Sequence, residues 1–247
     1  MNNGQIYDFV TTILRKEKNG SALTPDRFTL MLIESMWEKL NDEYRKYELS
    51  QIVTDSLNEI KTTASIILNV NGEYDLSGLV SPNEYWHPSA LSYDDSGNIR
   101  LIEIVTDLEF AERMSSSLLQ PDSYYPIAKF YRNSSDTEVI KVEPLTSTTL
   151  TFNYLRKPPE PFYDYYINAN DELIYMEPGD SHLLGTGEEY RDGTTSGTVN
   201  SISEELPFPE GNRLDIAYMI LQKFGIPVND DISFQYGIAK EQKEEQI

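Results

Sequence analysis

The chain has 247 residues, enough for one large domain or two small ones and for a sizeable hydrophobic core. It carries 41 acidic and 20 basic residues, a net charge of −21, which argues against sequence-reading nucleic-acid binders and proteins of anionic membrane surfaces. It has no cysteine, which excludes disulfides, thiolate catalysis and zinc sites with cysteine ligands. Because no basic leader precedes an apolar run and no stretch approaches the roughly 20 apolar residues of a membrane span, we expect neither a signal peptide nor a membrane helix.

Residues 1–60 have the pattern of a helical region. Apolar residues recur at three- and four-residue spacing through residues 5–18, which indicates an amphipathic helix. Thr24 and Pro25 are typical of a second helix start, as N-cap and first-turn residues, and a long apolar stripe follows them. We predict that these two helices form an antiparallel helical hairpin, with a shorter third helix at residues 51–57.

Residues 61–159 contain strand-like runs separated by turn residues, with one helical pattern among them. The predicted helix covers residues 107–115 and turns Leu108, Ala111 and Met114 inward. The β-branched and aromatic runs that we predict to be strands are residues 90–93, 99–105, 127–131, 139–143 and 148–156. This order predicts an antiparallel sheet of about five strands crossed by one helix, and an α+β fold for the chain.

The last two of these runs form the clearest strand pair in the sequence. In residues 148–156, the apolar residues Leu150, Phe152 and Tyr154 alternate with polar ones, so one face of the strand is apolar. Residues 144–147 have turn composition, and we therefore predict a hairpin between the two runs. A proline-rich stretch then ends the sheet, because proline cannot donate to a strand ladder.

Residues 160–210 differ from the rest of the chain because they are acidic and irregular. Residues 160–206 contain eleven acids and one base, Arg191, and only residues 173–176 have the composition of a short strand. A structureless segment this long is unusual inside a compact domain, so we predict an extended acidic arm that gains its shape from a partner. Helical patterns return in residues 211–247, which we predict to be C-terminal helices.

Residues of the types that carry chemistry are few and isolated. The two histidines, His87 and His182, lie in no recognisable triad or metal motif. Asp94-Asp95 and Asp230-Asp231 suit turns and helix caps and lack the ligand spacing of a calcium loop. Residues 185–188 lack the Gly-Lys-Ser/Thr ending of a phosphate loop. We therefore expect no catalytic residue, no cofactor and no metal, and a protein that is not an enzyme.

The predicted arm and the strand end before it supply the candidate interface. Arg156 and Lys157 are a basic pair beside the proline-rich stretch, and they either reach water at a strand end or anchor an acidic arm of a neighbouring subunit. Tyrosine suits interfaces because it combines a large apolar face with a polar tip. The side chains that we expect to contact another protein are Arg156, Lys157, Tyr163, Tyr165, Tyr166, Leu173 and Tyr175.

Several short segments of the sequence together resemble those of a known family. They are residues 6–10 (IYDFV), 23–28 (LTPDRF), 118–121 (LLQP), 125–128 (YPIA) and 151–158 (TFNYLRKP). This arrangement resembles a structural protein of crAss-like bacteriophages, the short-tailed phages of gut bacteria, in which it looks like a head–tail connector protein, a ring or adaptor below the portal. The resemblance covers most of the chain outside the acidic tract, and its motifs are structural rather than catalytic.

The resemblance implies a virion protein that is made in the host cytoplasm and assembles at the head–tail junction. It implies a homo-oligomeric ring, twelve-fold and thus a dodecamer, that docks on the portal protein and on other tail or connector proteins. Such a ring would form part of the DNA exit channel during DNA ejection, without sequence-specific contact and without a membrane, and an acidic lumen would repel the DNA backbone. A glycan hydrolase that uses paired carboxylates and a monomeric binding module are the alternatives that the sequence leaves open.

Overall fold

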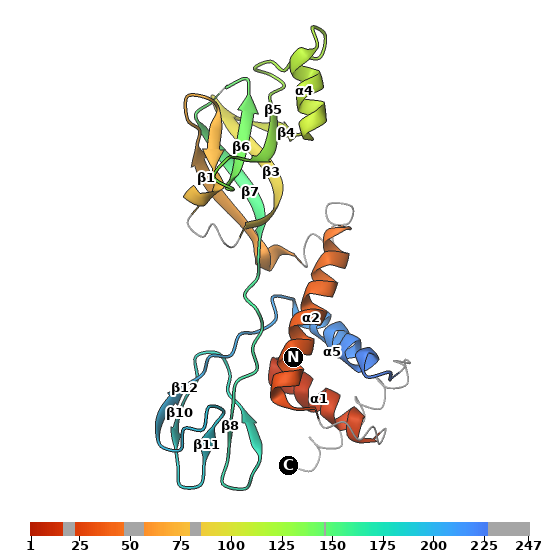
Figure 1. Cartoon of the computed structure of the whole chain (residues 1–247), viewed down its shortest axis with the longest axis vertical. Helices are drawn as coiled ribbons and strands as arrows, with labels where there is room; N and C mark the ends of the chain where they lie inside the picture. The colour runs from red at the N-terminus through yellow and green to blue at the C-terminus, as the bar shows by residue number, and fades with distance from the viewer. Residues whose placement is uncertain (17–22, 47–56, 80–84, 146, 227–247) are drawn as a thin grey trace. The chain divides into compact units, whose positions relative to one another are not determined.

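A computed structural model describes residues 1–16, 23–46, 57–79, 85–145 and 147–226, and the fold is α+β, as predicted (Figure 1). The chain divides into two compact units. Unit 1 combines Met1–Ser56 with Pro159–Ile247, and unit 2 is Leu57–Pro158. The predicted sheet region, 61–159, corresponds to unit 2, whereas the three other predicted regions all belong to unit 1.

Unit 2 is built on one curled sheet of seven strands rather than about five (Figure 1). Its order is β1-β7-β3-β4-β5-β6-β2, and all neighbours are antiparallel except β4 and β5, which are parallel. A parallel pair needs a crossover connection, and the predicted crossing helix, α4, provides it. The elements are β1 (Lys61–Ile67), β2 (Glu73–Asp75), β3 (Tyr85–Asp95), β4 (Asn98–Ile104), α4 (Asp107–Ser115), β5 (Ile127–Arg132), β6 (Glu138–Glu143) and β7 (Thr149–Arg156), with 3-10 turns at Asn58–Ile60 and Leu76–Gly78.

The predicted hairpin between the last two runs is wrong, because β6 and β7 are not neighbours in the sheet. β6 pairs with β5 and β2, whereas β7 lies between β1 and β3. The inward residues of β7 are nevertheless the predicted ones, since Leu150, Phe152 and Tyr154 are all buried. β3 and β4 are consecutive in the chain and form a hairpin, with Asp95 opposite Asn98.

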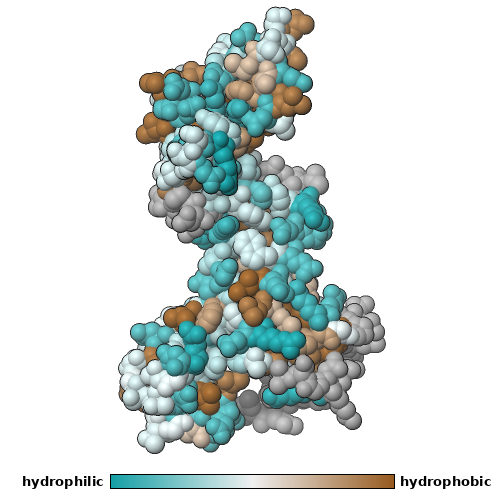
Figure 2. Space-filling view, in the orientation of Figure 1, coloured by the Kyte–Doolittle hydropathy of each residue, from teal (hydrophilic) through white to brown (hydrophobic). Residues whose placement is uncertain are grey.

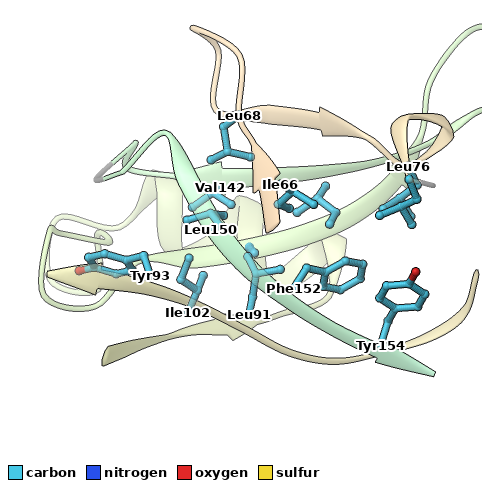
Figure 3. Packing of buried hydrophobic residues seen from close by; sticks show 13 residues of the cluster. Ile66, Leu68, Leu76, Leu91, Tyr93, Ile102, Val142, Leu150, Phe152 and Tyr154 are labelled. Carbon is cyan, nitrogen blue, oxygen red and sulfur yellow. The ribbon is translucent and has the colours of Figure 1, made fainter. Parts of the chain in front are cut away.

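The core of unit 2 lies inside the curl of the sheet (Figure 3). Alternate residues of neighbouring strands meet there in register: Phe152 of β7 lies opposite Ala64 of β1 and Leu91 of β3, and Leu91 lies opposite Ile102 of β4. Aromatic rings close one part of this core, where Phe152 packs against Tyr154 with ring centroids 5.1 Å apart. Every member of the cluster comes from unit 2, so this unit has a hydrophobic core of its own.

Helix α4 begins as predicted, with the Thr106 hydroxyl accepting a hydrogen bond from the Glu109 backbone N–H. Its buried face is not the predicted one. Phe110 is the buried residue of the helix and packs with Val105 and Ile127, whereas Leu108 is 70% exposed. Leu108 and Met114, the apolar residues predicted to face inward, are therefore exposed.

Three helices form the helical part of unit 1: α1 (Asn3–Lys16), α2 (Pro25–Tyr44) and α5 (Glu210–Lys223). The predicted start of α2 is confirmed, since the Thr24 side chain accepts a hydrogen bond from the Arg27 backbone N–H. The predicted two-helix hairpin is incomplete, because α5 packs against both α1 and α2. An ion pair of 2.8 Å between Lys39 and Asp215 joins α2 to α5. The predicted helix at 51–57, save for Leu57, and the last C-terminal helix lie outside the described residues.

The segment predicted to be an extended arm is instead folded. It contains β8 (Tyr165–Ile167), β9 (Leu173–Tyr175), β10 (Ser181–Leu184), β11 (Glu189–Tyr190) and β12 (Gly197–Asn200), arranged as the small sheets β11-β8-β9 and β10-β12. Met176, Leu184 and Tyr190 are buried together and give the segment a small core. It gains its shape from its own residues and from the helices of unit 1, which corrects the prediction that a partner is required.

Candidate interaction surface

Two of the predicted interface tyrosines, the buried Tyr163 and the half-buried Tyr175, pack within unit 1. The ring of Tyr163 is 3% exposed and lies 4.8 Å from the Tyr7 ring and 5.1 Å from the Tyr175 ring. The Tyr175 hydroxyl donates to Glu205 across 2.6 Å, and its ring packs directly on Gly4 of α1. The contacts of these two side chains are thus made within the unit.

The other predicted interface tyrosines are half-buried. Tyr166 stacks on His182 with ring centroids 4.0 Å apart, and Tyr165 lies 6.0 Å from the Tyr163 ring. Leu173, at the start of β9, is exposed. The structure therefore brings Tyr163, Tyr165 and Tyr175 together through ring contacts and the pairing of β8 with β9, whereas Tyr166 lies on the other face of β8.

Arg156 and Lys157 lie at the end of β7 in unit 2. One Arg156 guanidinium nitrogen donates to the Glu59 backbone carbonyl across 3.5 Å, and Lys157 is exposed. Acids of the segment 160–206 have contacts of their own in unit 1. His182 and the Gly185 backbone N–H contact Glu188, and Arg213 forms an ion pair of 3.0 Å with Glu205.

The paired acids of the β3–β4 turn have structural contacts. Asp94 accepts a hydrogen bond from the Gly97 backbone N–H, and Asp95 forms an ion pair of 2.7 Å with Arg100. Among the described residues, no three acids or histidines are placed to hold a metal ion. Burial lowers the pKa of His87, which favours the neutral ring. Asp230 and Asp231 lie outside the described residues.

Among the residues that the structure describes, the largest run of exposed apolar side chains lies in the connection between α4 and β5, residues 116–126. We call it the leucine–tyrosine loop, because it presents Leu118, Leu119, Tyr124 and Tyr125, which are exposed by 93, 68, 64 and 78%. Figure 2 shows hydrophobic residues over the α4 end of unit 2. Single exposed apolar residues are ordinary, but a group of four in one short loop is typical of a contact surface.

Side-chain caps hold this loop in one conformation. The Ser116 hydroxyl oxygen accepts hydrogen bonds from the backbone N–H groups of Leu118 and Leu119, across 3.2 and 3.1 Å. One Asp122 carboxylate oxygen accepts from the backbone N–H groups of Tyr124 and Tyr125, across 2.7 and 2.9 Å. Both are local turn motifs of serine and aspartate. Each cap therefore fixes one pair of apolar side chains in an outward position.

The loop is also attached to the sheet beneath it. The Tyr93 hydroxyl donates to the Ser123 backbone carbonyl across 2.7 Å, and the Arg100 guanidinium lies over the Tyr124 ring, 5.0 Å from its centroid. On the other side, Arg113 of α4 forms a two-point contact with Glu103 of β4, with distances of 2.6 and 2.9 Å. A preorganised surface loses less conformational entropy on binding than a floppy one, so this geometry favours association.

The sequence contained the residues of this loop but no signal that they are exposed. The sequence of Leu118–Gln120 is typical of the end of a helix. The exposure of the loop's leucines depends on Phe110, rather than Leu108, facing the sheet.

Comparison with known protein families gave no matching family model, and comparison with curated protein sequences gave no match. In the part of the chain that the structure describes, no helix is long and apolar enough to cross a membrane.

Proposed function

We propose that the chain is a non-enzymatic structural subunit of a bacteriophage head–tail connector, held in the virion by protein–protein contacts. The observation that carries the proposal is the leucine–tyrosine loop, which keeps four large apolar side chains outward by hydrogen bonds of its own. Two phrases behind the phage resemblance, residues 118–121 and 125–128, lie in this loop and at its end.

The energetics of the loop support a role in assembly. Burying one leucine side chain is worth about 1.5–3 kcal/mol, so Leu118 and Leu119 alone offer several kcal/mol to a partner that covers them. The net charge of −21 supports a place beside DNA, because an acidic surface does not bind the phosphate backbone. A connector subunit needs both properties, since it binds proteins while DNA passes.

Particles of a phage that encodes the chain provide the test. In the double variant Leu118→Ser/Leu119→Ser, we expect purified particles to lack the protein and heads to lack tails, although the variant is made and folded. The matched control is Leu183→Ser on β10, where a leucine of similar exposure, 70%, lies outside the loop. Quantitative mass spectrometry of wild-type particles should give several copies per portal ring.

The outcomes separate this role from the alternatives. Absence of the wild-type protein from virions, or a single copy per particle, contradicts the proposal. Normal particles from the double variant contradict the assignment of the loop as the contact surface. Turnover of a glycan that is lost on substitution of one acid would support the hydrolase alternative instead.

A further inference from the structure

Strand β1 lies at one end of the seven-stranded sheet, and β7 is its only partner strand in the described part of the chain. Just beyond the strand, the Leu68 backbone N–H donates to the Thr148 carbonyl across 2.7 Å, so these two residues are a hydrogen-bonded pair. Hydrogen-bonded and non-hydrogen-bonded pairs alternate along an antiparallel ladder. The backbone groups of every second residue of β1 therefore point away from β7, to the free edge: those of Thr63, Ser65 and Ile67.

This edge lacks the features that usually keep an edge strand from pairing with another chain, which are charge, proline, a bulge or short length. The opposite end of the sheet, β2, has such protection, since two of its three residues are acids. In β1, residues 62–67 contain neither charge nor proline, and the register with β7 runs without a shift. The side chains of Thr63, Ser65 and Ile67 are exposed.

Unpaired bases gather at one end of the same strand. Lys61 lies opposite Leu155, the residue before Arg156 and Lys157. Within the described residues, these three bases form no ion pair: Arg156 contacts a backbone carbonyl, and both lysines are exposed. The other bases of unit 2 all form ion pairs with acids of that unit, and they are Arg100, Arg113, Lys129, Arg132 and Lys141. In a chain with 41 acids and 20 bases, this cluster favours an anionic partner.

We infer that β1 binds an extended segment of another protein, which adds an antiparallel strand to the sheet and carries acidic residues at its carboxyl end. Backbone donors and acceptors at every second residue of an edge match the backbone of a further strand. Antiparallel pairing is the more stable kind, and it places the carboxyl end of the added strand beside Lys61. The inference goes beyond the proposed function, because it concerns a surface other than the leucine–tyrosine loop.

The charges select a different protein rather than a second copy of this chain. Pairing of β1 with β1 of a second copy would satisfy the backbone groups, but β1 contains no acid that could reach the unpaired bases. Two copies that each carry −21 also repel one another. A segment that ends in carboxylates satisfies both the edge and the bases.

The two sides of β1 define the side chains of a suitable peptide. Positions opposite Thr63 and Ser65 lie on the exposed side of the sheet and suit polar residues, whereas positions opposite Ala64 and Ile66 lie on the core side and suit apolar ones. The peptide TVTVTVEE, with blocked ends, has this pattern. When its middle threonine lies opposite Ser65, its first glutamate lies opposite Lys61.

Fluorescence anisotropy of this labelled peptide with the purified full chain tests the strand addition. Ser65→Pro removes an N–H that faces the free edge, and proline is tolerated there because no bond to β7 is lost. We expect the affinity to fall by about tenfold or more, as for a lost hydrogen bond with an unpaired acceptor. Ser65→Ala keeps the N–H and is the control, with affinity within about twofold of the wild type.

Modified peptides decide the question if the proline variant does not fold, which circular dichroism shows. An N-methyl group on the middle threonine removes the donor that meets the Ser65 carbonyl, so binding should be lost. The same group on the next valine, whose N–H points away from β1, should leave binding unchanged. Equal binding of the two methylated peptides, or equal binding to wild type and a folded Ser65→Pro variant, would overturn the strand addition.

The isomeric peptide EETVTVTV tests the acidic end. At low salt we expect TVTVTVEE to bind about fivefold more tightly, a difference of the size that exposed charge contacts give. Lys61→Gln should reduce this preference. Arg132→Gln changes the net charge equally but lies in an ion pair on β5, so it should not. Equal affinity of the two peptides for the wild type would overturn the assignment of an acidic carboxyl end.

Amide hydrogen exchange, measured by NMR, tests whether the edge is free. Without peptide, we expect fast exchange at Ser65 and Ile67 and slow exchange at Ala64 and Ile66, whose N–H groups face β7. Addition of TVTVTVEE should slow exchange at Ser65. Slow exchange at Ser65 and Ile67 without peptide would show that the edge is already covered, by this chain or by a second copy, and would overturn the inference.

Discussion

The Arg191 guanidinium forms an ion pair with Asp164, with 2.9 Å between Nε and Oδ1, and the Asp164 side chain is completely buried. Its other oxygen accepts hydrogen bonds from the Tyr190 hydroxyl at 2.6 Å and from the Ile202 backbone N–H at 2.9 Å. Arg191 is the single base of residues 160–206, and it pairs with Asp164, the one acid of this segment that is completely buried. This contact joins the start of β8, the end of β11 and the stretch after β12.

We predict that Arg191→Met lowers the free energy of unfolding of unit 1 by about 3 kcal/mol, because it leaves a buried carboxylate without its cation. Urea unfolding followed by far-UV circular dichroism measures the change. Glu189→Gln is the control, since Glu189 is exposed on β11, two residues before Arg191, and we expect a change within about 0.5 kcal/mol. Equal stability of the two variants would show that Arg191 is not needed to hold the segment.

The folded state of this segment could not be predicted from local sequence patterns. Its buried residues Met176, Leu184 and Tyr190 are separated by turns, so they follow neither a period of two nor one of 3.6. Asp164 and Arg191 are 27 positions apart, and their pairing depends on the whole arrangement of strands. Sequence-based reasoning interpreted the acid-rich composition as an arm, because it could not show that one base compensates one buried acid.

The start of α1 gives a second prediction. Gly4 lies against Tyr175, and a Cβ atom at this position would lie 2.6 Å from the ring atom Cδ1. The ring cannot move freely, because its hydroxyl donates to Glu205 and its face stacks on Tyr163. We predict that Gly4→Val destabilises unit 1 by about 2–3 kcal/mol through this overlap.

Gly211 is the matched control for that substitution. It occupies the second position of α5, as Gly4 does in α1, but no heavy atom lies within 4 Å of its hypothetical Cβ. Thermal unfolding of Gly211→Val should therefore give a midpoint close to that of the wild type. If both valine variants lose the same stability, the cost comes from the helix start and not from Tyr175.

Tyrosine ionisation gives a third prediction, on stability at alkaline pH. Burial raises the pKa of Tyr163, and burial together with the hydrogen bond to Glu205 raises the pKa of Tyr175, both above the ordinary value of 10.0. Both side chains are therefore neutral in the folded state at a pH where the unfolded chain has ionised them. Their contribution is fully present below pH 10 and is lost as pH rises above it.

Absorbance near 295 nm, which reports tyrosinate, checks this prediction. We expect part of the tyrosine signal to appear only when unit 1 unfolds, as monitored by circular dichroism in the same titration. Tyr163→Phe should reduce that delayed fraction and weaken the dependence of stability on pH above 10. Tyrosine ionisation that is complete before unfolding begins would contradict the burial argument.

The sheet of unit 2 shows how far alternation alone can predict structure. Alternation in residues 148–156 identified the inward side chains of β7, and Leu150, Phe152 and Tyr154 are indeed buried. It could not identify the neighbours, because pairing of β7 with β1 and β3 depends on residues more than 50 positions earlier in the chain. The leucine–tyrosine loop was missed for a related reason, since the exposure of Leu118 and Leu119 follows from which face of α4 meets the sheet.

The separate core of unit 2 gives the last prediction. Phe152 is fully buried in that core, and Phe152→Ala should lower the stability of unit 2 by about 3–5 kcal/mol by leaving a cavity. Hydrogen exchange of the full chain, read by mass spectrometry of peptides, locates the effect. We expect faster exchange in residues 57–158 and unchanged exchange in α1, α5 and the strands of unit 1, because the cluster around Phe152 contains no residue of unit 1.

Two further variants make that experiment decisive. Thr151→Ala, one position away on the exposed side of the same strand, should leave exchange unchanged in both units. Arg191→Met should give the opposite pattern to Phe152→Ala, with faster exchange in unit 1 alone, because Asp164 and its partners belong to unit 1. If either destabilising variant raises exchange equally in both units, the two cores unfold as one cooperative body and unit 2 is not an independent folding unit.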